Sequence, residues 1–367
     1  MRGKTTFSMK RFIFFIVVVL AMVIVARAED GEEFLFDGLK YRVLSEVDKT
    51  VELTKVTYDD EFEYPEGALI LPENLDCEGV NYTVVAIGES AMEEWMDLTS
   101  VVLPNSVTVI GPRAFLGCSS LESIQLPSAL TSIDYQAFAF CKSLNAPIIP
   151  ASVEMVGGGL FQYCDQVKEI EVAPGNKHYR SEGGVLYDYS GTTLLECPAG
   201  RSECVIADGV TTIDAGAFHG CRNLTSLTLP ESVKRIEDEA FADCGLTSLR
   251  VPDSVTYMGE SVFEYSDSVA EVVLSEGLTE VGHSTFDGCV DLCKVVLPSQ
   301  LNQLSAMMFS ECTGLSEIIA KNPTPPAVDY ATFDDLPTDV TIYVPSGSAA
   351  AYRSADGWNR FSDFREM

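Results

Sequence analysis

Apolar and polar positions along the chain follow a unit of 23 residues that is repeated many times. Within one unit, Ile124 and Leu126 alternate with polar residues, which is the period of a β-strand, and Pro127 then ends the strand. A longer segment leads from the next apolar pair to a cysteine, as over 236–244, and it has room for one or two helical or 3-10 turns. The pattern therefore predicts one short strand and one helical-turn segment in each unit.

Each unit also carries a phenylalanine, which is followed three positions later by a cysteine in most copies. Consecutive phenylalanines are 22 or 23 residues apart, except that 57 residues separate Phe161 from Phe218. One such unit cannot bury its apolar face alone, whereas stacked units share one core. The spacing therefore predicts a solenoid with a parallel sheet along one side, built on Phe115, Phe138, Phe161, Phe218, Phe241, Phe263, Phe286 and Phe309.

The repeated unit closely resembles the BspA-type leucine-rich repeat, which reads roughly Ala-Phe-x-x-Cys-x-x-Leu-x-x-Ile-x-Leu-Pro. Residues 114–136 and 217–239 match it almost position for position, and the resemblance covers residues 84–320. It implies a β-rich (α/β-type) leucine-rich-repeat solenoid of 23-residue repeats. Residues 29–83 look like the N-terminal β-rich cap of that family, and residues 321–367 look like its C-terminal capping segment.

The long interval between Phe161 and Phe218 equals two repeats plus 11 residues. Within it, the segment 183–195 reads as two short strands around a turn. We therefore expect a hairpin insertion in the solenoid at about 172–205.

Residues 1–28 have the three parts of a secretory signal peptide. Basic residues are followed by the apolar run Phe12 to Val25 and then by Ala26-Arg27-Ala28. The apolar run has 14 residues, whereas a helix that spans a bilayer needs about 20. We expect cleavage after Ala28, a secreted or cell-surface protein, and no membrane span in the mature chain; an uncleaved N-terminal anchor is the alternative.

The charge balance narrows the range of partners. The chain has 24 Lys and Arg against 55 Asp and Glu, a formal charge of −31, and loss of residues 1–28 would change that to −36. A surplus of this size repels phosphate backbones and anionic lipid headgroups, so we expect neither nucleic-acid binding nor electrostatic membrane docking. A protein partner remains the expectation.

Seven of the eleven cysteines occupy the same position in the repeat, and they are Cys118, Cys141, Cys164, Cys221, Cys244, Cys289 and Cys312. We interpret this position as a small buried slot, because Ser266 replaces the cysteine in one copy and because the CxxC pairs of a metal or redox ladder are missing. Cys197 and Cys204 lie outside the series and flank a short Pro-Ala-Gly segment, so they are candidates for a disulfide.

Motifs for catalysis are missing from the sequence. It contains no phosphate-binding G-x-x-x-x-G-K-[ST] loop, no H-E-x-x-H and no G-x-S-x-G, and its three histidines are scattered. We assign no catalytic, cofactor-binding or metal-binding residue and expect no enzyme, and we place His219 on the surface. The abundant acidic residues leave open an accessory protein of carbohydrate processing or an uncharacterised extracellular enzyme. A structural component of an envelope complex is a third alternative.

The side chains that alternate with the buried strand positions form two outward rows. If Ile124 and Leu126 point inward, Ser123 and Gln125 point outward, and their equivalents line the sheet. An apolar stripe beside alternating charges marks one end of these rows, where it either binds a partner or is covered by the terminal cap. The candidate protein-contact surface consists of Arg250, Glu271, Val273, Lys294, Val296, Glu317 and Ile319.

Solenoids offer long, rigid surfaces for recognition, and the resemblance implies adhesion. We expect a non-catalytic exported module that binds host, matrix or envelope proteins.

Overall fold

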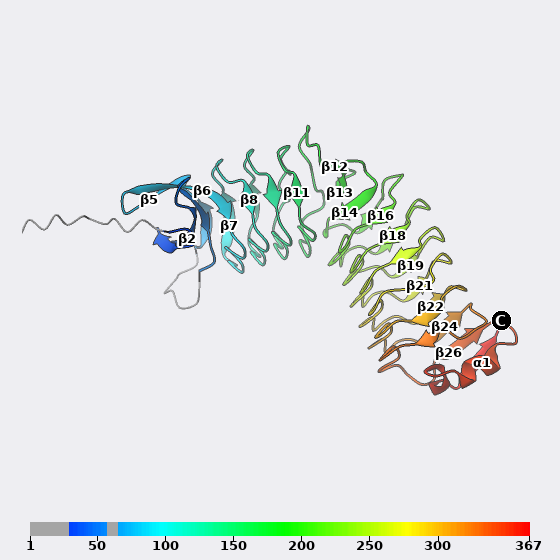
Figure 1. Ribbon diagram of the computed structural model, residues 1–367. Helices are drawn as coiled ribbons and strands as arrows, with labels where there is room; N and C mark the ends of the chain where they lie inside the picture. Colours follow the sequence, from blue (N-terminus) through cyan, green and yellow to red (C-terminus); the bar gives the residue numbers. More distant parts are fainter. Residues whose placement is uncertain (1–28, 57–64) are drawn as a thin grey trace, which may run out of the picture.

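The protein is a curved solenoid of short strands with a β-rich cap at one end and a short helix at the other (Figure 1). The computed structural model describes residues 29–56 and 65–367. The predicted signal peptide, residues 1–28, lies outside the described part. The predicted leucine-rich-repeat solenoid is confirmed, and helix makes up very little of it.

The N-terminal strands form a meander that merges with the first turn of the solenoid. Strands β1 (Glu33–Phe36), β2 (Leu39–Ser45) and β3 (Thr50–Leu53) pair antiparallel in this order. Strand β6 (Val80–Ile87) pairs antiparallel with β5 (Asn74–Cys77) and parallel with β3. Because β6 also pairs parallel with β8 (Val109–Ile110), a strand of the repeats, it spans the predicted boundary at residue 84.

Each turn of the solenoid, here called a rung, contributes strands to two sides of the molecule. The first strand of a rung is the predicted one that ends before a proline. These first strands pair in parallel, and they are β4 (Gly67–Ile70), β7 (Leu98–Val102), β9 (Ser123–Gln125), β15 (Glu203–Cys204), β17 (Ser226–Leu227), β19 (Ser248–Arg250), β21 (Glu271–Val273), β22 (Lys294–Leu297), β24 (Glu317–Ala320), β26 (Thr341–Val344) and β27 (Asp363–Glu366).

A second strand of about two residues, which we did not predict, follows in most rungs on the next side of the solenoid. These second strands are β8 (Val109–Ile110), β10 (Ser132–Ile133), β11 (Met155–Val156), β14 (Thr193–Glu196), β16 (Thr212–Ile213), β18 (Arg235–Ile236), β20 (Tyr257–Met258), β23 (Gln303–Leu304) and β25 (Ala327–Val328). Most of them hold a buried Ile, Leu or Met of the second apolar pair, so this pair marks a second side of short strands.

The third side of each rung, around the phenylalanine, is built from tight turns. The segment 236–244, which has room for one or two helical or 3-10 turns, forms no helix: Ile236 ends a strand, and turns occupy 238–243. In the equivalent segment one rung earlier, the Cys221 N–H donates to the Phe218 carbonyl within the turn at 3.1 Å, while the Phe218 N–H donates to Ala240 of the next rung at 2.8 Å. Backbone groups are thus shared between rungs, and positive φ angles at Glu239 and Asp243 prevent a helix.

The phenylalanines stack along the solenoid and form the centre of its core. Neighbouring rings lie 5.0–6.1 Å apart and nearly parallel. The stack stops between Phe161 and Phe218, and the buried residues divide there into two clusters. One cluster extends from Leu39 to Leu186, and the other begins at Val185.

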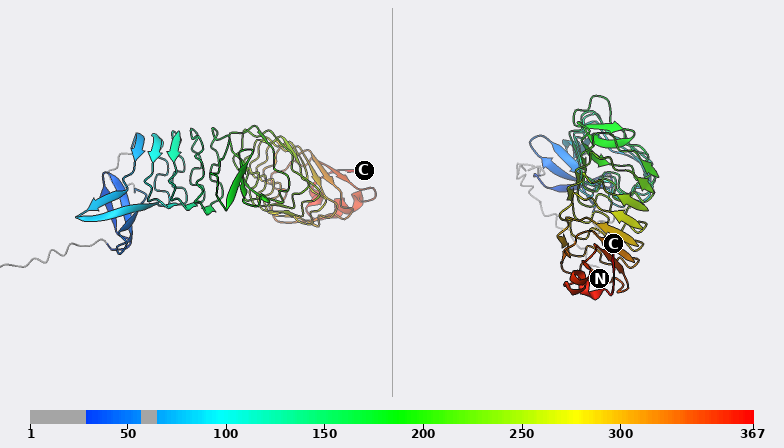
Figure 2. Two further views of the ribbon diagram at one scale, coloured as in Figure 1. Left: turned by 90° about the horizontal axis from the view of Figure 1, so that it is seen from above. Right: turned by 90° about the vertical axis from the view of Figure 1, so that its right-hand side faces the viewer.

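The division coincides with a hairpin inside the predicted insertion. Strands β12 (Tyr179–Glu182) and β13 (Val185–Asp188) pair antiparallel, and β13 continues antiparallel to β14. The Tyr179 hydroxyl accepts the Val156 N–H at 2.9 Å, so β12 lies beside β11. Two extra strands therefore widen the second-strand side only, and the solenoid bends at this point (Figures 1 and 2).

Aromatic residues close the C-terminal end. Helix α1 (Ala349–Ser354) and the 3-10 helix η1 (Trp358–Arg360) cover the last rung. The buried Trp358 indole donates to the Pro326 carbonyl at 2.9 Å, and Phe333 meets its ring edge-on. Within residues 29–56 and 65–367, the helices are too short to cross a membrane.

Candidate functional site: the first-strand face

The outward side chains of the first strands line one side of the solenoid, which we call the first-strand face. Parallel register places Val101 beside Ile124 and Val102 beside Gln125. Ile124 is buried, whereas Ser123 and Gln125 are exposed, as predicted. Equivalent residues of successive rungs therefore lie in two rows along the solenoid.

The charged half of the predicted contact surface forms one of these rows. Glu271, Lys294 and Glu317 lie side by side on β21, β22 and β24. The Lys294 ammonium contacts the Glu271 carboxylate at 2.8 Å, and this hydrogen bond raises the pKa of Lys294. Arg250 lies in the adjacent row, beside Val273, and its guanidinium is largely exposed. Arg250 has its own ion-pair partner, Asp253 at 3.6 Å, but both of these side chains are largely exposed, so Arg250 is the most accessible charge of the predicted surface.

The apolar half of the predicted surface is contiguous but mostly covered. Val273, Val296 and Ile319 occupy matching positions on adjacent strands. Only 7% of Val296 is exposed, and the other two side chains are half-buried. The stripe thus contributes more to packing within the sheet than to an open contact surface.

Exposed apolar residues lie instead at the N-terminal end of the same row. Ile70, Val102 and Ile148 are 73%, 44% and 56% exposed, and Gln125 lies between the last two. The neighbouring row carries no charge either, since it consists of Ala68, Ser100, Ser123 and Ala146. Sequence reasoning missed this uncharged part of the face because it weighed runs of apolar residues. The absence of charge over successive rungs of a strongly acidic chain was the available signal.

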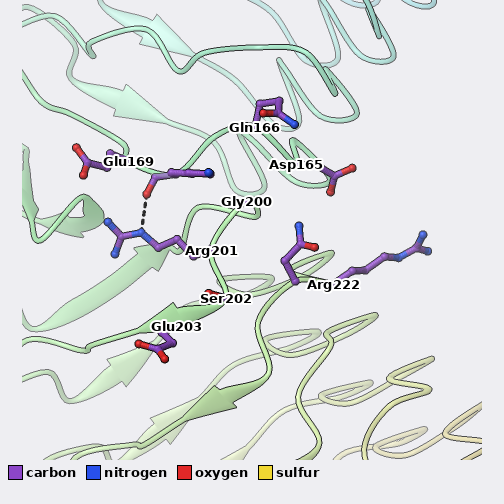
Figure 3. A pocket seen from close by; sticks show the side chains of 10 residues that line it. Asp165, Gln166, Glu169, Gly200, Arg201, Ser202, Glu203 and Arg222 are labelled. Carbon is purple, nitrogen blue, oxygen red and sulfur yellow. Dashed lines mark hydrogen bonds between the residues drawn. The ribbon is translucent and has the colours of Figure 1, made fainter.

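A polar groove interrupts the first-strand face at the hairpin. It has a volume of about 900 Å³ and is lined by Asp165, Lys168, Glu169, Arg201, Glu203 and Arg222, among others (Figure 3). The Gly200 N–H donates to the Val167 carbonyl at 2.9 Å, and the Arg201 guanidinium donates to the Lys168 carbonyl at 2.5 Å. Between these two rungs, a side-chain hydrogen bond from Arg201 and a backbone hydrogen bond from Gly200 thus take the place of the usual ladder of strand hydrogen bonds.

A buried carboxylate joins the two halves of the solenoid behind this groove. Both oxygens of Glu196 accept backbone N–H groups, from Leu160 at 3.0 Å and from Phe161 at 2.5 Å. In the preceding rung, the Phe138 N–H donates to the Leu160 carbonyl, so Glu196 replaces a backbone acceptor. Burial raises the pKa of Glu196 to about 8, against the opposing effect of the two N–H donors.

His219 also lies at this junction, and its predicted place on the surface needs correction. It is half-buried, and its Nε2 is 3.0 Å from the Tyr163 hydroxyl of the N-terminal half. Its Nδ1 lies 3.2 Å from the Glu239 carboxylate. Burial lowers the pKa of His219, although Glu239 and Asp243 oppose the shift. The histidine therefore bridges the two halves.

The cysteine slot is confirmed, and the structure adds a reason for the residue type. The slot cysteines are buried, and the Cys289 thiol donates to the Phe263 carbonyl of the preceding rung at 2.9 Å. Ser266 uses its hydroxyl in the same way, toward Phe241 at 2.7 Å. Each slot thus holds a small side chain that donates one hydrogen bond between rungs. In the part of the chain that the structure describes, no group of three or more His, Cys, Asp or Glu residues is arranged to hold a metal ion.

The fold and its repeat define a leucine-rich-repeat solenoid. The family model for the BspA type leucine rich repeat region matches residues 85–182 and 197–316 in six copies, and the chain belongs to this family.

Two solved structures show the same fold. The pneumococcal vaccine antigen PcpA is 18% identical, with a TM-score of 0.68 over 92% of this chain and 99% of its own. A leucine-rich repeat protein from Eubacterium ventriosum is 22% identical, with a TM-score of 0.57 over 86% and 98%. No curated protein matches the chain.

Proposed function

We propose that the protein is an exported, non-catalytic binding module that presents its first-strand face to a host, matrix or envelope protein. The observation that carries the proposal is the uncharged part of this face, where Ile70, Val102 and Ile148 are exposed on three of four successive rungs of a strongly acidic molecule. Exposed apolar residues held together on a rigid surface are typical of protein-contact sites. Membership of a leucine-rich-repeat family agrees with this use of the fold.

The predicted contact residues extend the same proposed surface toward the C-terminus. Arg250, Glu271, Val273, Lys294, Val296, Glu317 and Ile319 lie on consecutive first strands. The backbone hydrogen bonds between rungs fix the spacing of their side chains, so little backbone entropy would be lost on binding. In this proposal the uncharged part supplies apolar contact area, while Arg250 and its neighbours supply orientation through charge.

Binding is favoured over catalysis by the way the buried titratable groups are used. Both Glu196 oxygens accept backbone hydrogen bonds, and the His219 nitrogens face Tyr163 and Glu239. These groups hold the solenoid together, which leaves them poorly placed to act on a substrate.

Export rests on the predicted signal peptide, and it has a direct test. The full chain would be expressed in a host with a secretory pathway, and the N-terminus of the exported protein would be sequenced. A mature chain that begins at Glu29 is the expected result. A chain that stays membrane-bound with residues 1–28 intact would favour the uncleaved anchor.

The binding proposal is tested by comparing variants that are matched in charge. Residues 29–367 would be immobilised and used to capture proteins from extracellular matrix and envelope extracts. Ile148→Lys changes the first-strand face, and Met155→Lys changes the exposed second-strand side of the same part of the solenoid. Arg250→Glu is matched in the same way by the exposed Lys234→Glu.

We expect Ile148→Lys or Arg250→Glu to lower capture at least tenfold, while each control retains it. Equal capture by all four folded variants would remove the first-strand face from consideration. Failure to capture any partner would refute the binding proposal as a whole.

A further inference from the structure

The rung that follows the hairpin has a shortened third side. Parallel register aligns Leu194 with Ile213, and Cys204 with Leu227. Ten positions lead from Leu194 to Cys204, whereas 14 lead from Ile213 to Leu227. Four residues are therefore missing from the turn of this rung, and with them the phenylalanine that other rungs add to the stack.

Two cysteines bracket the shortened turn and lie next to each other. Cys197 and Cys204 are free thiols in the structure, both are buried in the C-terminal core cluster, and each lies close enough to shift the pKa of the other. Neither donates to the carbonyl of a preceding phenylalanine, as the slot residues Cys141, Cys289 and Cys312 do. A third cysteine is near, because the Cys221 thiol donates to the Cys197 carbonyl at 3.5 Å.

The Cys204 side can be reached from outside. It lines an open groove of about 410 Å³ together with Glu203, Val205, Ile206 and Ser226, among others. The next residue, Val205, is 84% exposed. A reagent that enters this groove approaches Cys204 first, and Cys197 lies behind it in the core.

We propose that Cys197 and Cys204 form a disulfide that fastens the shortened rung, made by exchange with a disulfide-bearing carrier in the export compartment. The Cys204 thiolate attacks one sulfur of the carrier disulfide, which forms a mixed disulfide and releases one carrier thiolate. The Cys197 thiolate then attacks the Cys204 sulfur and releases the second carrier thiolate. The carrier gains two electrons, and the two protons lost by the cysteines protonate its thiolates.

The local environment sets the expected rate of this exchange. Its hydrogen bond with Cys197, together with burial, raises the pKa of Cys204, so the reactive thiolate is scarce at neutral pH. Oxidised glutathione at pH 8.5 is therefore a suitable probe for purified protein.

Trypsin offers a sharp readout because Arg201 lies between the two cysteines. Cleavage after Arg180, Arg201 and Arg222 places Cys197 in the peptide 181–201, and Cys204 and Cys221 in the peptide 202–222. Residues 29–367 would be incubated with the probe, alkylated under denaturing conditions and digested without reduction. We expect the two peptides to appear as one linked species, and nine of the eleven cysteines to be alkylated.

Variants identify the partner of Cys197. We expect the linked species to persist in Cys221→Ser and in the control Cys244→Ser, and to be lost in Cys204→Ser. Circular dichroism would establish that each variant is folded before oxidation. Persistence of the link in Cys204→Ser would assign the bond to Cys221 instead, and it would overturn the proposal. Eleven alkylated cysteines in the unaltered chain after oxidation would overturn it as well, as would a closed loop within 202–222.

Discussion

Replacing Glu196 with glutamine should remove a pH-dependent loss of stability from the junction of the two core clusters. The folded protein holds the Glu196 carboxyl with a pKa of about 8, whereas the unfolded chain has the ordinary value of 4.5. Between these two values the folded state binds a proton that the unfolded state releases. Stability is therefore highest below about pH 4.5 as far as this group is concerned, and it falls as the pH rises through 8.

The size of the effect follows from the shift. Each pKa unit corresponds to about 1.4 kcal/mol, so the shift amounts to roughly 5 kcal/mol between the two limits. The physical cause is the burial of a carboxylate whose only compensation is two backbone N–H groups. Glutamine has nearly the same shape and stays neutral, although its amide N–H₂ must face one of these donors, which costs a constant amount at every pH.

Urea unfolding of residues 29–367 at half-unit steps from pH 5 to pH 9 measures the effect. Other carboxylates titrate equally in both proteins, so the difference in unfolding free energy between wild type and Glu196→Gln isolates this group. We expect the difference to change by about 4 kcal/mol in favour of the variant between pH 5 and pH 9. The exposed Glu171→Gln is the control and should give a flat difference. Parallel curves for wild type and Glu196→Gln would refute the reasoning.

Three further predictions concern the other contacts that join the rungs. Cys289→Ser should keep the hydrogen bond to the Phe263 carbonyl, whereas Cys289→Val loses it and overfills the slot. The valine variant should therefore lower the unfolding free energy, measured in urea, by about 1–3 kcal/mol more than the serine variant. Equal losses would mean that the thiol hydrogen bond contributes nothing to stability. Phe241→Ala removes one ring of the stack and should lower the unfolding free energy by about 3–5 kcal/mol in the same assay, and a loss below 1 kcal/mol would show that the stack is not the core. Reduction of the proposed disulfide, which closes an eight-residue segment, should lower stability by about 2–3 kcal/mol in wild type and not in Cys204→Ser, as followed by thermal unfolding with and without dithiothreitol.

The solenoid could be predicted because its period is carried by apolar residues that the core requires. Phe115 and its equivalents, and the small slot residue three positions later, have to recur at each rung. The turns around them left no such signal. Positive φ angles occur at Arg113, Gln136 and Met307, where glycine would have marked them, and hydrogen bonds to the next rung hold these residues in place. Backbone hydrogen bonds between rungs, rather than the local sequence, thus determine the conformation of these turns.

The sequence predicted where the candidate contact residues lie in the sheet better than it predicted how exposed they are. Strand alternation correctly placed Val273, Val296 and Ile319 in one row, but alternation alone says nothing of how far neighbouring strands and loops cover each residue. Glu196 was missed for a related reason. An acidic residue after two leucines resembles any exposed strand position, and the sequence carries no sign that its carboxyl accepts the Phe161 N–H of the preceding rung.

The divided Phe stack has a consequence for a molecule held at both ends under force. Each rung contains 23 residues, which extend to roughly 80 Å, while its removal shortens the solenoid by only about 5 Å. If the rungs unfolded one at a time, the distance between the two ends of the molecule would increase many-fold, and each unfolding step would dissipate mechanical work. Because the two halves of the solenoid have separate core clusters, one half can unfold while the other keeps its surface intact.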